Sequence, residues 1–210
     1  MKGNANSSST YERTVFPEGI YPMTLDKAFV MWGKPSQYAP EGAPKIGMVW
    51  KYTDDEGNEY ELMDFLTFPK NFAYNDKSNF WKRVGEIAGA AVTKDNVGDV
   101  DLDLGEFIQS YDELIEHIRS VNDQGRPEKA DVKGLAVGDQ QLLGKQCQLV
   151  VKVWQNGDKE GNNITSVLQI GASQKPLKPQ KAAPAAQQKA AAPAARPAPA
   201  PVAAGAELPF

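Results

Sequence analysis

The chain has 210 residues, and its 23 Lys and Arg against 27 Asp and Glu give a formal net charge of −4. Its one cysteine, Cys147, excludes an internal disulfide and a cysteine-based zinc site, and its one histidine, His117, excludes a histidine-rich metal centre. No apolar run approaches the roughly 20 residues that a membrane-spanning helix needs, and residues 1–14 lack the apolar block of a secretory signal. We therefore expect a cytoplasmic protein with no membrane segment, no metal and no other cofactor.

Composition divides the chain into four parts. Residues 1–14 are rich in Ser and Asn and predict a flexible N-terminal arm, and residues 15–174 are long enough to bury the core of a domain. Residues 175–206 are dominated by Ala and Pro and predict a disordered linker, because they cannot bury enough apolar surface to offset the entropy of ordering. Residues 207–210 form a short tip after this linker.

Acidic residues are unevenly distributed along the chain. Residues 1–174 hold 18 basic and 26 acidic side chains, and residues 95–131 alone carry a net charge of −8. A basic face elsewhere on the body is compatible with these totals, because salt screens charges that lie more than ~8–10 Å apart.

Five segments have the patterns of β-strands. The first is rich in β-branched and aromatic residues. In the second, the large apolar and aromatic residues Ile46, Met48, Trp50 and Tyr52 occupy every other position, and a turn-forming run joins it to the third. The predicted strands are Ile20–Trp32, Ile46–Tyr52, Tyr60–Phe68, Leu142–Trp154 and Ile164–Ile170, with a hairpin loop at residues 156–162 between the last two.

Two helices are expected between the third and fourth strands. The first is capped by Asp76 or Ser78 and runs to about Ala91, and a weaker one spans residues 110–121, whereas residues 122–140 predict a loop. Three strands, a helical insertion and two strands follow the order of the OB-fold, a five-stranded Greek-key barrel. The sequence thus predicts an all-β fold with helical insertions, OB-fold-like, with an unclosed β-sandwich as the alternative.

The acidic run at residues 99–106 has a spacing similar to the start of a calcium-binding loop. Leu104 stands where that loop needs glycine, and Ser110 stands where it needs its closing glutamate. His117 falls on the outer face of the second predicted helix, where an ion pair with a neighbouring carboxylate is expected. These patterns favour neither a metal site nor an enzyme.

The tip consists of Glu207, Leu208, Pro209 and Phe210. A phenylalanine on a long linker is suited to fill an apolar pocket of a partner, and the proline before it lowers the entropy cost of binding. An OB-fold-like body, an Ala/Pro/Gln linker and this tip together resemble the bacterial and bacteriophage single-stranded DNA-binding proteins. In that family the barrel holds single-stranded DNA and the tip recruits proteins of replication, recombination and repair, so the resemblance implies the same partners here.

Binding of single-stranded DNA without sequence preference needs aromatic faces for the bases and cations for the phosphates. Residues 68–77 interleave aromatic residues with lysines, and the first long loop and the last hairpin correspond to the loops that flank the binding face of an OB-fold. The candidate contacts are Trp32, Lys34, Tyr38, Lys45, Lys51, Lys70, Phe72, Tyr74, Lys77, Trp154 and Lys159. Packing in the core is the alternative for the aromatic residues, and a solvated surface charge is the alternative for the lysines.

The predicted function is that of a non-enzymatic protein that coats single-stranded DNA. The alternatives are an interaction adaptor, whose barrel binds a partner protein instead of DNA, and a metal-dependent nuclease. The sequence leaves open whether the chain forms a homo-oligomer. If the chain is encoded by a bacteriophage, its compartment is the cytoplasm of the bacterial host.

Overall fold

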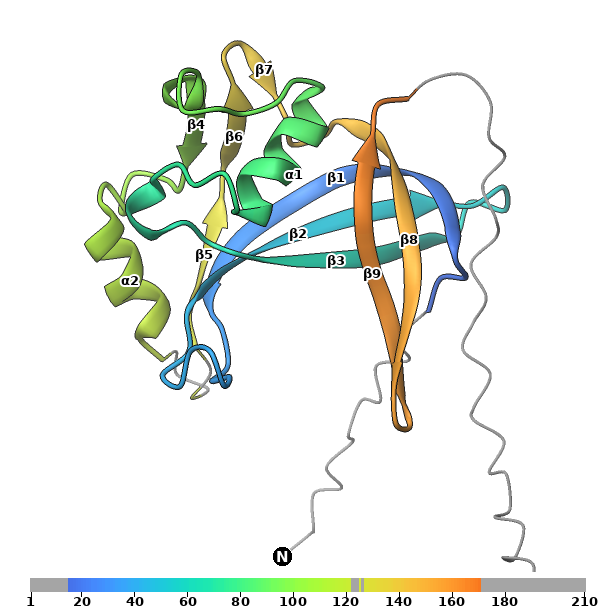
Figure 1. Ribbon diagram of the computed structural model, residues 1–210, viewed down its shortest axis with the longest axis horizontal. Helices are drawn as coiled ribbons and strands as arrows, with labels where there is room; N and C mark the ends of the chain where they lie inside the picture. Colours follow the sequence, from blue (N-terminus) through green and yellow to red (C-terminus); the bar gives the residue numbers. More distant parts are fainter. Residues whose placement is uncertain (1–14, 122–124, 126, 171–210) are drawn as a thin grey trace, which may run out of the picture.

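The computed structural model describes residues 15–121, 125 and 127–170, and within them the chain is mostly β-sheet with two short α-helices (Figure 1). In chain order the elements are β1 (Gly19–Trp32), β2 (Pro44–Thr53), β3 (Glu59–Thr67), the 3-10 helix η1 (Lys70–Phe72), α1 (Asn79–Ala88), the 3-10 helix η2 (Val97–Asp99), β4 (Val100–Asp103), α2 (Tyr111–Arg119), β5 (Lys129–Val132), β6 (Gly134–Val137), β7 (Gln140–Gln141), β8 (Gln146–Asn156) and β9 (Lys159–Leu168). The expected N-terminal arm, linker and tip lie outside the described residues.

The five predicted strands correspond to β1, β2, β3, β8 and β9, and both predicted helices are present. Ser110 caps α2 with its side chain, which accepts a hydrogen bond from the Glu113 N–H, whereas α1 ends at Gly89 in the left-handed conformation that glycine adopts most readily. The prediction of a loop at residues 122–140 is wrong, because β5 and β6 lie in it and β7 begins at its last residue. β5 pairs with β1 and β6 pairs with β4, so both depend on partners distant in the sequence.

The main sheet is antiparallel, with the strand order β3-β2-β1-β8-β9, and β5 joins it along β1. β1 is long enough to serve two neighbours, because its first half pairs with β8 and its second half pairs with β5. Asp26 is an extra residue between the pairs Leu25–Trp50 and Lys27–Val49, so it forms a β-bulge. Leu25 is therefore buried in the core, whereas Lys27, two positions on, is exposed.

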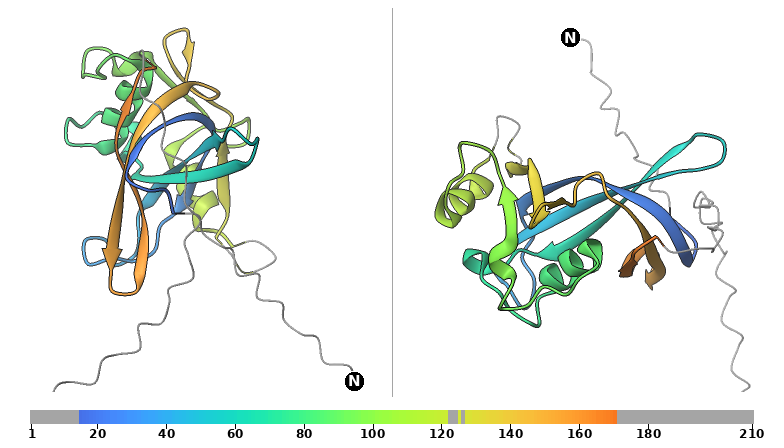
Figure 2. Two further views of the ribbon diagram at one scale, coloured as in Figure 1. Left: turned by 90° about the vertical axis from the view of Figure 1, so that its right-hand side faces the viewer. Right: turned by 90° about the horizontal axis from the view of Figure 1, so that it is seen from above.

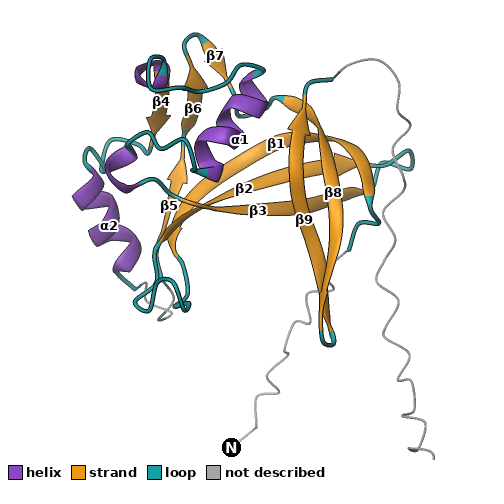
Figure 3. Cartoon of the chain, viewed as in Figure 1, coloured by secondary structure: helices purple, strands orange, loops and turns teal. Residues whose placement is uncertain are grey.

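The core lies between α1 and one face of the sheet. Buried residues of α1, among them Phe80 and Ile87, belong to the same apolar cluster as Ile46, Met48 and Trp50 of β2. Figure 2 shows from two further sides how the β8–β9 hairpin crosses the direction of β1, β2 and β3, and Figure 3 shows both helices outside the strands. The opposite face of β1, β2 and β3 is left for other contacts.

Arg83 of α1 links β3 to β9, the strands at the two ends of the sheet order. Its Nε donates a hydrogen bond to Asp64 Oδ2 of β3 at 2.8 Å, and its Nη2 donates to the Ile164 carbonyl of β9 at 2.9 Å. Its Nη1 also pairs with Glu86 Oε2 at 2.6 Å. Burial raises the pKa of the Asp64 carboxyl, and the Arg83 guanidinium opposes that rise. A buried ionic bridge therefore closes this side of the fold.

Candidate nucleic-acid interface

The face of β1, β2 and β3 that points away from α1 is hereafter called the outer face. Its residues follow from the strand register, which aligns them in rows across the sheet. The first row is Lys129, Met31, Lys45 and Thr67, the second is Asp131, Phe29, Gly47 and Phe65, and the third is Lys27, Val49 and Met63.

Two phenylalanine rings lie across Gly47 in the middle of the outer face. The rings of Phe29 and Phe65 meet edge to face, with centroids 6.1 Å apart, and Phe65 is 47% exposed. A Cβ added at Gly47 would lie 2.6 Å from Phe29 Cζ and 3.0 Å from Phe65 Cε1, so the missing side chain makes the room that the rings occupy. Phe29 is buried, yet it is not part of the core cluster. Phe65 therefore presents an exposed aromatic surface, the buried Phe29 ring supports it from across Gly47, and the two rings are hereafter called the platform.

Lysines border this platform. The Lys129 ammonium lies 4.3 Å from the centre of the Phe29 ring, which is a cation–π distance, and Lys45 is in the neighbouring row. Lys27 forms an exposed ion pair with Glu61, and Asp131 forms one with Lys133. Among the described residues no ion pair involves Lys45 or Lys129, so no carboxylate partner offsets their charge, and the Lys129 ammonium rests on the Phe29 ring.

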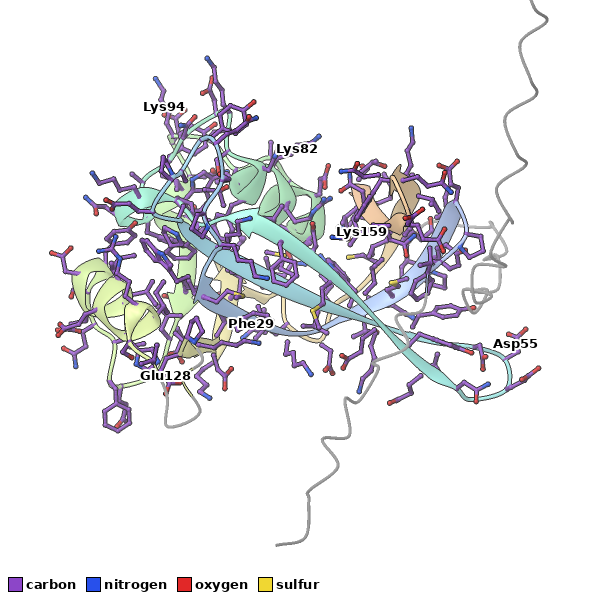
Figure 4. The ribbon with its side chains drawn as sticks, turned by 90° about the horizontal axis from the view of Figure 1, so that it is seen from below. Phe29, Asp55, Lys82, Lys94, Glu128 and Lys159 are labelled. Carbon is purple, nitrogen blue, oxygen red and sulfur yellow. The ribbon has the colours of Figure 1, made fainter. Side chains whose placement is uncertain are left out.

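The loop after β1 and the tip of the β8–β9 hairpin extend to the same side of the sheet (Figure 1). Figure 4 views that side from below, with Phe29 on the sheet and Lys159 on the hairpin. Lys34 and Tyr38 are exposed in the loop, and Trp154 lies across Gly161 with 39% of its surface exposed. Two flanking segments thus bring predicted contact residues toward the outer face.

Trp32 is held by its own loop. Its indole N–H donates a hydrogen bond to the Glu41 carbonyl at 2.9 Å, and the Arg119 guanidinium lies 4.1 Å from its ring centre. One face of the indole is therefore already covered by a cation. As a DNA contact, Trp32 stays a prediction.

Phe72 and Tyr74 in the loop after β3 both contact Trp81 of α1. The Phe72 ring centre is 4.9 Å from that of Trp81, and the Tyr74 ring centre is 6.4 Å from it. Both rings are half-buried against the core, which was the alternative for them. Tyr74 nevertheless lines a surface cavity together with Lys70 and Lys77, so the fold brings three of the predicted contacts together.

Lys45 and Lys51 lie on the same strand and face but differ in their partners. Lys51 lies 3.8 Å from Asp26 and 3.6 Å from Glu59, and these carboxylates offset its charge. We expect K45Q to weaken binding of oligo(dT). The slope of log affinity against log salt concentration should also become shallower, by about 0.7 for each phosphate that Lys45 neutralises. K51Q should change neither. Titrations at several salt concentrations would measure both, and equal effects of the two substitutions would contradict this assignment.

Sequence reasoning missed Phe29, Phe65 and Lys129. A signal for Phe65 was present, because residues of β3 alternate and Phe65 falls out of phase with the buried Leu62 and Leu66. The pairing of Phe29 with Gly47 depends on the bulge in β1 and on the join between β1 and β2 across a long loop. Neither is fixed by local pattern.

The residues that the structure describes contain no cluster of three or more His, Cys, Asp or Glu that could hold a metal ion. Within the same residues no helix is long and apolar enough to cross a membrane. No family model matches the chain, and neither a curated protein nor a solved structure matches it.

Proposed function

We propose that this chain binds single-stranded DNA on its outer face, without sequence preference and without catalysing a reaction. The observation that carries the proposal is the platform of Phe29 and Phe65 over Gly47, with Lys45 and Lys129 beside it. Aromatic faces stack on any base, and lysines follow the phosphates, so this combination binds strands of any sequence. A duplex hides its bases and cannot use the platform.

The strand order supports an OB-fold assignment. β1, β2 and β3 are consecutive neighbours, β8 returns to pair with β1, and α1 stands between the third strand and this return. OB-folds bind oligonucleotides on the face of their second and third strands, between the first loop and the last hairpin. The platform and its two flanking segments have this arrangement. In phage or bacterial replication, recombination and repair, such a protein would coat exposed strands, and residues 207–210 would recruit partner proteins.

Fluorescence titration with oligo(dT) tests the proposal, because Trp32 and Trp154 lie in segments that flank the outer face. We expect the emission of the full chain to be quenched by oligo(dT), with an affinity that falls as salt rises. A duplex of the same length should bind much more weakly. Equal affinity for single strand and duplex, or no quenching at all, would refute the proposal.

An interaction adaptor is the second candidate, and the exposed apolar side chains of the outer face favour it. Met63 is 45% exposed beside Phe65, and apolar rows of this kind also serve as protein interfaces. The adaptor would bind a partner protein through the same face with no nucleic acid present. Quenching by oligo(dT) would decide between the candidates, because an adaptor predicts none.

Gly47 offers a direct test of the platform. We expect G47A to lower the affinity for oligo(dT) roughly tenfold, because the added methyl group displaces the rings and stacking of one base is worth about 1–3 kcal/mol. The closest clash is with the rigid ring of the buried Phe29, so G47A should also lose some stability, and its binding is compared at a temperature at which thermal unfolding shows it to be folded. G98A is the matched control, since a Cβ there meets nothing within 4 Å. Unchanged binding by G47A would show that the rings are not the binding surface.

A further inference from the structure

A surface cavity of about 630 Å³ lies where β3 passes into α1. Its lining includes Thr67, Lys70, Tyr74, Lys77, Ser78 and Asn79. Two lysines thus line a space that hydroxyl and amide side chains also line. Such a lining suits an anion that accepts several hydrogen bonds.

The lining of this cavity contains lysines and no carboxylate. Three other cavities of the described body differ in this respect, since Asp101 lines one, Asp76 and Glu86 line another, and Asp64 and Glu86 line the third. Lys70 and Lys77 are exposed, and in the described part of the chain no ion pair involves them. Within that part, the two lysines therefore have no carboxylate partner that an anion would have to displace.

The cavity is continuous with the outer face. Thr67 ends the row that contains Lys45, and Thr67 and Pro44 both line the cavity. A strand that crosses the platform and follows this row would reach the rim of the cavity without leaving the protein surface. Tyr74, whose ring contacts Trp81, supplies an aromatic surface inside it.

We propose that this cavity is a second nucleotide subsite, which holds a backbone phosphate between Lys70 and Lys77 and the attached base against Tyr74. The inference rests on the proposed function, since it extends the path of the same strand beyond the platform. An acidic body would then bind DNA through two positive regions that are joined by one row of the sheet.

The test compares K70Q and K77Q, alone and combined, with K94Q. K94Q removes the same charge from an exposed lysine in the loop after α1, outside the cavity lining (Figure 4). We expect the double variant to bind a 12-mer of oligo(dT) roughly fivefold more weakly. The slope of its log affinity against log salt concentration should become shallower by about 0.7, because one phosphate fewer is neutralised. A 4-mer, which the platform alone accommodates, should bind as tightly to the double variant as to the unsubstituted chain.

Because both lysines are exposed, thermal unfolding of the double variant should match that of the unsubstituted chain. Affinity and salt dependence equal to those of K94Q, in a protein whose unsubstituted form binds oligo(dT), would overturn the subsite and leave the platform standing. An equal loss for the 4-mer and the 12-mer would also overturn it, since the lysines would then act on the platform. Failure of the unsubstituted chain to bind oligo(dT) would overturn both proposals.

Discussion

Replacing Phe29 and Phe65 together by alanine is expected to lower the affinity of the full chain for oligo(dT) by roughly 30-fold or more. Each stacked base contributes about 1–3 kcal/mol, and the double substitution removes both rings of the platform. Lysines remain, so weak binding that depends strongly on salt should persist. Titration of F29A/F65A by anisotropy of a labelled oligonucleotide would measure the loss.

The matched control is F107A. Phe107 is 94% exposed and lies in the acidic segment between β4 and α2, so its loss removes an aromatic ring without touching the outer face. Phe29 and Phe65 lie outside the core cluster, and the double variant should therefore still unfold cooperatively. An affinity within twofold of the unsubstituted chain would place the binding surface elsewhere.

Removal of Arg83 should have the largest effect on stability. R83M leaves the buried Asp64 carboxylate and the Ile164 carbonyl without their donor, and breaking a buried ion pair in this way costs about 3–5 kcal/mol. That is a large part of the roughly 5–15 kcal/mol that stabilise an ordinary domain. Urea unfolding at neutral pH would show a midpoint far below that of the unsubstituted chain, and failure of R83M to fold has the same meaning.

The double variant D64L/R83M shows how much of the stability lost in R83M comes from the unpaired Asp64 charge and how much comes from lost packing. It removes both buried charges, so it should recover most of the stability that R83M loses. Without Arg83, burial and the neighbouring Glu86 carboxylate both raise the pKa of Asp64, with nothing from the guanidinium to oppose them, further above its ordinary value of 3.8. An acid with a raised folded-state pKa stabilises the fold below its ordinary pKa and loses that contribution as pH rises through the folded value. The deficit of R83M should therefore be smaller near pH 4 than near pH 7, and no recovery in either experiment would contradict the bridge.

The long strands could be predicted from the sequence, because the alternation and turn residues that mark them lie within each strand or beside it. Alternation in β2 and the turn-forming residues before β3 predict the first hairpin, and the ends of β2 and β3 differ from the prediction by at most two residues. β5 and β6 are only four residues long, and their pairing with β1 and β4 supplies what their own sequence does not. The hairpin predicted between the last two strands is present, but its loop is a tight turn at Gly157 and Asp158 and not the whole of residues 156–162, because β8 and β9 pair as far as Asn156 and Lys159.

The candidate site was predicted less completely, for a physical reason. Loops with lysines and aromatic rings are visible in sequence, whereas the platform forms only when three strands are placed in register. The role of Gly47 could not be predicted, because it depends on the pairing of this residue with Phe29 on one side and Phe65 on the other. Lys51 shows the converse, because carboxylates that offset its charge come from two other parts of the sheet.

The extra residue at Asp26 changes which alternate positions of β1 face the core. Before it, Tyr21, Met23 and Leu25 point inward, and after it Phe29 and its neighbours of the same parity point to the other side. Deleting Asp26 would remove the bulge and leave Phe29 on the outer face, because Lys27 would then follow Leu25 directly, as their partners Val49 and Trp50 follow each other. The second half of β1 still contributes Ala28 and Val30 to the core, and only its alternate positions Lys27, Phe29 and Met31 face outward. A designer could therefore vary these three outward positions alone and leave the interior intact.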